Sequence, residues 1–205
     1  MKKLFLLILL GLAGVLTWYF FVTRKKPKEE GPRQQAVVVS QHSDSFNVSV
    51  NKVLTAYYGL SDALVNWDSA AANRQAGALK ASLEGANFNE LKKDTPIYQT
   101  ALSYIDASKA EAGTIAEARD LTAKRRAFHN LSQNLYDLLR TIRFDEAKVY
   151  LQECPMAFND EEQGLWLDKT EAIRNPYLGL HHPKYGKGML ECGSTKDTLN
   201  FTPSH

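Results

Sequence analysis

The sequence lacks the short motifs by which most enzymes are recognised. It contains no G-x-G-x-x-G loop, no phosphate-binding loop ending in Gly-Lys-Ser/Thr, no H-E-x-x-H and no C-x-x-C. The haem-attachment pattern C-x-x-C-H is also missing. Ser, His and Asp are present, but no pattern in the sequence brings any three of them together. We therefore expect a protein that is not an enzyme.

An excess of charge of one sign is absent as well. The formal net charge is only +2, and no long basic run is interleaved with aromatics, so nucleic-acid binding has little electrostatic support. Hydrophobic residues make up 44% and charged residues 23% of the chain, which is the composition of a folded protein. We divide the 205 residues into an apolar segment (1–23), a linker (24–43), one domain (44–197) and a tail (198–205).

The one long apolar run lies near the N-terminus. Leu4 to Val22 carries no charge, and a helix of this length at about 1.5 Å per residue nearly matches the ~30 Å hydrocarbon core of a bilayer. No A-x-A-like cleavage site follows it. We therefore expect contact with the membrane through residues 4–22, as an uncleaved transmembrane anchor in preference to a cleaved signal peptide.

Four amphipathic stretches follow the linker. Apolar residues recur at intervals of three and four, which predicts helices over about 44–67, 68–85, 96–118 and 120–142. Asp68 and Asp120 stand at N-cap positions, Gly85 ends the second helix, and Pro96 lies in the first turn of the third. No strands alternate with these helices. The expected fold class is all-α, an antiparallel four-helix bundle.

Two polar features of the fourth helix are predicted to be solvated. The run of three basic residues from Lys124 to Arg126 predicts an exposed helix face. His129 falls beside Phe128 and off the apolar stripe, so we expect it at the surface and not in a ligand role.

Sulfur is scarce and unevenly distributed. Beyond the fourth helix, from about 144 to 197, we expect an irregular segment, and it holds both cysteines and both internal methionines. They form the clusters C-x-M (Cys154 and Met156) and M-x-x-C (Met189 and Cys192). Thiolate and thioether are soft ligands that suit Cu(I). Pro155 favours a turn inside the first cluster, and i, i+3 spacing brings the second pair to one side of a turn.

Composition by itself also supports a disulfide. A Cys154–Cys192 bridge would close a loop of about 39 residues and stabilise the fold by roughly 4 kcal/mol in the chain-entropy model. The two methionines would then fill gaps near the bridge. A thiol-redox role is disfavoured, because neither cysteine lies in a C-x-x-C motif.

The C-terminal motif "CPMAF…G…WL…IRNPY.G…ML.CG" resembles the signature of a bacterial exported domain of unknown function. That domain occurs alone or fused to periplasmic adaptor (membrane-fusion) proteins of copper and silver efflux pumps. The resemblance covers about 46–197, including "IAEARDL" and "F.NLSQNLYDLL". It implies that the domain lies in the periplasm, anchored in the inner membrane or exported after signal cleavage.

The resemblance also implies binding of Cu(I) or Ag(I), with handover to adaptor or efflux-pump components. By matching motif positions, the ligands are Cys154, Met156, Met189 and Cys192. Residues Arg174, Asn175, Pro176 and Tyr177 match the motif's turn and are expected to shape the loop. The sequence departs from the pattern at "LHHPKYG", which is inserted before Met189 and adds His181 and His182 as candidate ligands or as an exposed loop. The competing interpretation is a disulfide-stapled helical interaction or scaffold module with no metal role.

Overall fold

The computed structural model describes residues 15–20 and 40–203. Residues 15–20 are helical, and residues 40–203 form the folded domain. Within these two ranges, no helix is both long enough and apolar enough to cross a bilayer. Apart from residues 15–20, the expected anchor at Leu4–Val22 lies outside the described residues.

The helices form where the sequence predicts them. The domain begins with α2 (Asp44–Val65), α3 (Ser69–Glu84), the short 3-10 helix η1 (Asn89–Lys93), α4 (Thr95–Glu117) and α5 (Leu121–Ile142). The side chains of Asp68 and Asp120 cap α3 and α5, accepting backbone N–H groups three residues on at 2.8 and 2.9 Å. Pro96 lies in the first turn of α4, and Gly85 is the C-cap of α3. Local capping and periodicity were therefore sufficient to define the four α-helices, whereas η1 lies in the predicted connection between the second and third helices and was not expected.

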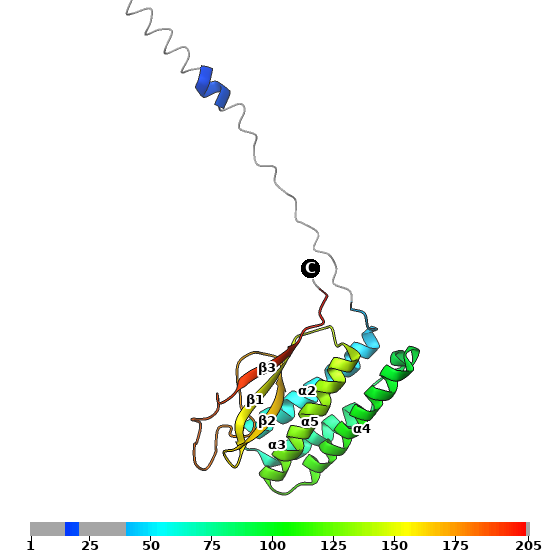
Figure 1. Cartoon of the computed structure of the whole chain (residues 1–205), viewed down its shortest axis with the longest axis vertical. Helices are drawn as coiled ribbons and strands as arrows, with labels where there is room; N and C mark the ends of the chain where they lie inside the picture. The colour runs from blue at the N-terminus through cyan, green and yellow to red at the C-terminus, as the bar shows by residue number, and fades with distance from the viewer. Residues whose placement is uncertain (1–14, 21–39, 204–205) are drawn as a thin grey trace, which may run out of the picture. The chain divides into compact units, whose positions relative to one another are not determined.

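Consecutive helices pack side by side as an antiparallel bundle (Figure 1). Each helix contributes one apolar stripe to a common core. Its fully buried members include Leu60, Leu64, Leu79, Phe128 and Leu131. The predicted four-helix bundle is thus present, but it is only part of the domain.

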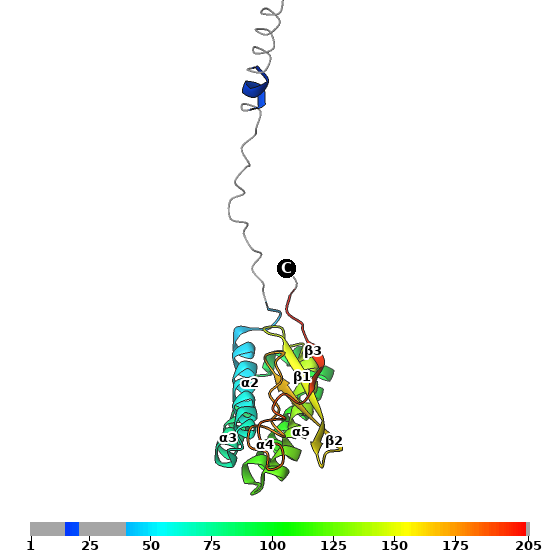
Figure 2. The same cartoon turned by 90° about the vertical axis from the view of Figure 1, so that its left-hand side faces the viewer.

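The expectation of an all-α fold is wrong. The segment predicted to be irregular contains β1 (Val149–Phe158), β2 (Glu162–Asp168) and β3 (Ser194–Leu199), which form an antiparallel sheet in the order β2-β1-β3. Asn159 and Asp160 connect β1 to β2 with φ angles of 54° and 62°, a conformation that Asn and Asp tolerate better than most residues. The sheet lies along one side of the bundle, with β2 against α5 (Figures 1 and 2).

The middle of β2 is buried on both faces, which removes the alternating pattern of a half-exposed strand. Leu165, Trp166 and Leu167 are consecutive in β2 and all buried. The bundle covers one face, and the segment 169–193 covers the other, where the Gln152 side chain donates to the carbonyls of residues 170–172. Pro155 is accommodated in the central strand because the register of β1 and β2 shifts between Cys154 and Phe158.

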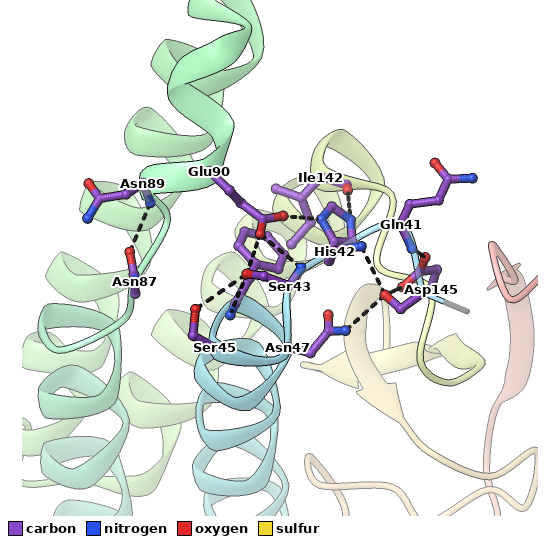
Figure 3. Close-up of polar contacts among 12 residues, drawn as sticks. Gln41, His42, Ser43, Ser45, Asn47, Asn87, Asn89, Glu90, Ile142 and Asp145 are labelled. Atoms are coloured by element: carbon purple, nitrogen blue, oxygen red, sulfur yellow. Dashed lines mark hydrogen bonds and ion pairs between the residues drawn. The ribbon is translucent and has the colours of Figure 1, made fainter. Parts of the chain in front are cut away.

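The last residues of the predicted linker are bound to the domain (Figure 3). The imidazole of His42 places Nδ1 2.6 Å from a Glu90 carboxylate oxygen and Nε2 2.9 Å from the carbonyl of Ile142. The Ser40 hydroxyl and the Gln41 N–H both donate to Asp145 at 2.7 Å. Residues 40–43 therefore join the start of α2 to η1 and to the end of α5.

Candidate metal centre

The fold brings the two cysteines together. Cys154 lies on the central strand β1, and Cys192 lies in the turn just before β3. Their Sγ atoms are 3.4 Å apart and both thiols are free. A disulfide bond requires about 2.05 Å, and two thiolates on a tetrahedral ion at about 2.3 Å would be roughly 3.8 Å apart. Only a small movement separates the pair from either state.

Asn175 positions the turn that carries Cys192. This residue is completely buried. Its N–H donates to the Leu190 carbonyl at 2.8 Å and its Nδ2 to the Cys192 carbonyl at 2.7 Å. Its Oδ1 accepts the N–H groups of Tyr177 and Leu178 at 2.8 and 3.0 Å. One amide side chain therefore ties the Asn-Pro-Tyr turn to the turn containing the cysteine.

Gly193 allows Cys192 to approach β1. Its φ angle of 146° is one that residues with a side chain rarely adopt. A Cβ at this position would lie 2.5 Å from the Glu153 carbonyl oxygen and 2.9 Å from the Trp166 ring. The absent side chain thus permits the close contact that brings Cys192 next to Cys154.

The cysteines differ in their environment. Cys154 is fully buried, whereas Cys192 is partly exposed. Burial raises the pKa of the Cys192 thiol to about 11, and the neighbouring Cys154 adds to the shift. The Cys192 thiol is therefore protonated at neutral pH, and a metal ion would have to displace that proton.

Each methionine is close in sequence to one cysteine of this pair. Met156 follows Cys154 in β1 and lies within the register shift. Met189 begins the turn that ends at Cys192, whose N–H donates to the Met189 carbonyl at 3.1 Å. Both side chains are half-buried and pack against the core. No hydrogen bond joins either thioether to a cysteine thiol among the residues that the structure describes.

The two inserted histidines are placed differently. His181 is exposed. His182 is half-buried, and its Nδ1 accepts the N–H groups of Lys184 and Tyr185 at 3.2 and 3.3 Å. Across residues 15–20 and 40–203, no group of three or more His, Cys, Asp and Glu side chains is arranged to hold a metal ion. A site here would consist of two thiols and would need the thioethers to complete it.

The exposed face predicted for Lys124 to Arg126 is wrong for two of its three residues. Lys124 is completely buried, because its ammonium group donates to the Ile115 and Ala118 carbonyls and to the Asn73 side chain. Arg125 is only 5% exposed. The spacing contained a signal for Lys124, which follows Leu121 by three residues and precedes Phe128 by four and so lies on the apolar stripe.

The prediction for His129 is also incorrect. The residue is half-buried, and its Nδ1 accepts the N–H of Leu165 in β2 at 3.1 Å. Burial, reinforced by the charge of Arg126, lowers the pKa of His129. His129 therefore has a structural role, in linking α5 to the sheet.

Comparison with known proteins finds a match to a family model over the helical part only. Residues 53–146 match a family described as "Protein of unknown function (DUF3347)". The matched range runs from within α2 to the residues just before β1, so it ends before the cysteines. No curated protein and no solved structure matches the chain. The class defined by fold and site is thus a four-helix bundle with an added antiparallel sheet that carries a thiol pair.

Proposed function

We propose that the protein binds a soft monovalent metal ion, Cu(I) or Ag(I), through Cys154 and Cys192, with Met156 and Met189 as thioether donors. The observation that carries the proposal is the 3.4 Å distance between sulfur atoms of residues 38 apart in sequence. Soft sulfur ligands select Cu(I) over hard cations such as Mg²⁺ and Ca²⁺. The bound ion would be held and passed on, with no chemistry on a substrate.

The proposed setting is the bacterial cell envelope. The uncharged apolar segment at residues 4–22 supports export of the domain. The resemblance of the C-terminal motif to domains fused to copper and silver efflux adaptors supports an adaptor or efflux component as the recipient. Capture of the ion would add a metal-mediated link between the segment that precedes β3 and the central strand.

A second function is favoured by the same distance. If the sulfur atoms closed from 3.4 Å by about 1.4 Å, an external oxidant that accepts two electrons, with release of the two thiol protons, would convert the pair to a disulfide. The raised pKa of Cys192 keeps that thiol protonated, which slows attack by thiolate but does not prevent oxidation. The protein would then be a stapled interaction or scaffold module.

The intact mass of the purified protein separates the two functions. Without reductant, a disulfide lowers the mass by two hydrogen atoms, whereas a bound copper ion raises it. The reduced protein is next titrated with Cu(I) against a competing chelator. Because the metal must displace the Cys192 proton, the apparent affinity should rise with pH, by up to about tenfold per unit for that proton.

Variants then assign the ligands. Cys154→Ser or Cys192→Ser should lower Cu(I) affinity by about 100-fold or more, beyond the range for loss of a supporting group. Met156→Leu and Met189→Leu keep volume and apolarity but should each weaken binding on the order of tenfold. His181→Ala is the matched control, because this residue is exposed, and it should have no effect. Unchanged affinity in both methionine variants would refute the four-sulfur site, and no binding by the reduced protein would refute the metal role.

A further inference from the structure

Arg125 is a buried cation whose hydrogen bonds are all to neutral groups. Its Nε donates to the Pro176 carbonyl at 2.9 Å and one terminal nitrogen, Nη2, donates to the Leu64 carbonyl at 3.1 Å. The guanidinium also stacks on the Trp67 ring, 4.1 Å from its centroid. Leu64 lies in the last turn of α2, so this bond places positive charge at the negative end of the helix dipole.

These contacts leave some hydrogen-bond donors of the guanidinium without a protein acceptor. Among the described residues, no carboxylate forms an ion pair with Arg125, and its other terminal nitrogen, Nη1, has no hydrogen-bond partner. Burial lowers the pKa of Arg125 to about 10, so the group keeps its charge at neutral pH. Nη1 is not one of the fully buried atoms that lack a partner, so an anion can reach it and pair with a charge that has no counterion of its own.

Arg125 lines a cavity of about 340 Å³. The walls include the rings of Trp67, Phe158 and Tyr177. This volume and the combination of aromatic walls with a few polar groups are typical of sites for small molecules. Met156, a proposed thioether donor, also lines this cavity, whereas neither cysteine does.

The other charged groups of the cavity neutralise one another. The Lys184 ammonium lies 2.7 Å from the Asp160 carboxylate, and the Tyr185 hydroxyl also donates to that carboxylate at 3.1 Å. Burial, reinforced by the charge of Arg125, lowers the pKa of His182, so its imidazole is neutral at pH 7. The charge of Arg125 is therefore the one left without a counterion among the groups that line this cavity.

We propose that this cavity binds a small carboxylate with a flat aromatic body. The carboxylate would pair with the free edge of the Arg125 guanidinium, a charge-assisted hydrogen bond of the stronger kind. The aromatic body would pack against Trp67, Phe158 and Tyr177. An inorganic anion offers no such body, and a neutral aromatic amide offers no charge, so the two parts of the site are separately testable.

Benzoate is the probe, with benzamide, acetate and inorganic phosphate as comparisons, on the full-length, reduced and metal-free protein. Binding is followed by NMR at the Trp67 indole N–H, which donates to the Leu178 carbonyl at 3.0 Å. Benzoate should saturate this signal and bind at least about tenfold more tightly than the other three. No binding of benzoate to the folded protein would overturn the proposal. If benzamide bound as tightly as benzoate, the cavity would recognise only the apolar ring. If phosphate bound as tightly as benzoate, the cavity would recognise only the charge. Either result would also overturn the proposal.

Two variants and a control locate the probe. Thr122→Trp, at an exposed position in the first turn of α5 that lines the cavity, should keep the fold and abolish benzoate binding by filling the space. Arg125→Met should weaken binding by about tenfold or more, with circular dichroism used to check that it folds. Arg74→Gln removes an exposed cation of α3 that does not line the cavity, and should leave affinity within about twofold. Retained binding in Thr122→Trp would refute this location.

Discussion

The thiol pair depends on two residues that carry no sulfur. Asn175 uses its backbone and its side-chain amide to hold the turn ending at Cys192. Gly193 then lets the chain pass so close to β1 that a methyl group would meet the Glu153 carbonyl. The position of Cys192 is therefore set by its neighbours, and it is sensitive to changes that leave every candidate ligand in place.

Gly193→Ala tests this dependence. The substitution forces a side chain into a left-handed backbone region and against β1, so we expect a loss of about 1–3 kcal/mol in the free energy of unfolding. Cu(I) affinity should fall with it, because Cys192 would move away from Cys154. Urea unfolding and the chelator competition measure the two effects.

Gly113→Ala is the matched control. This glycine lies inside α4, and nothing lies within 4 Å of the position of an added Cβ. The change should stabilise the protein by about 0.5–1 kcal/mol, the usual gain in helix propensity, and leave metal binding unchanged. If Gly193→Ala behaved like this control, the close approach would not determine the geometry of the thiol pair.

At the scale of elements, α5 connects the two layers of the domain. Leu131 and Leu135 extend from it into the bundle core, where their exposed fractions are 0% and 1%. From the same helix, Arg125 and His129 bind the segments that build the site, through the Pro176 carbonyl and the Leu165 N–H. A change in α5 therefore acts on the bundle and on the sheet together.

Leu131→Ala and Leu135→Ala should each cost on the order of 2–5 kcal/mol in the free energy of unfolding, because each removes buried methyl groups and leaves a cavity. Chemical denaturation followed by circular dichroism gives the values. Asn130→Ala on the exposed side of the same helix loses one hydrogen bond to Glu111 and should change stability by less than about 0.5 kcal/mol. Equal costs for the leucine and asparagine variants would contradict the assigned core.

At the scale of the whole domain, bundle and sheet share one hydrophobic core. Tyr57 of α2 stacks on Phe128 with ring centroids 5.1 Å apart, and its hydroxyl accepts the Leu167 N–H of β2 at 2.9 Å. Burial raises the pKa of Tyr57 far above its ordinary value, so this hydroxyl remains neutral. The family match ends at residue 146, although one of the elements that pack against α5, the strand β2, lies beyond it.

A chain truncated after Glu146 should therefore not behave as a complete domain. Loss of the sheet uncovers Phe128 and Tyr57, so we expect binding of a hydrophobic dye and a broad unfolding transition instead of a cooperative one. The full-length protein is the reference for both measurements. A truncated chain that unfolded cooperatively at the same midpoint, without binding dye, would show that the bundle is an independent unit.

The sequence by itself was sufficient to predict the α-helices, because helix ends and amphipathic faces depend on residues close together in the chain. Asp68, Asp120, Gly85 and Pro96 mark those ends wherever the helices pack. It also indicated both cysteines as the residues of interest, since the sulfur clusters are local patterns. Whether they form a metal site or a disulfide was open in the sequence, and the 3.4 Å separation is compatible with both.

The sheet was decided only by tertiary structure. Leu165, Trp166 and Leu167 show no alternation, because the bundle buries one face of β2 and segment 169–193 the other. The edge strand β3 is mostly polar and carries almost no hydrophobic signal. Likewise, Lys124 can be buried because its ammonium group donates to carbonyls at the end of α4. Arg125 can be buried because its guanidinium donates to the Leu64 and Pro176 carbonyls. Such partners lie on other elements, so their positions exist only once the chain has folded.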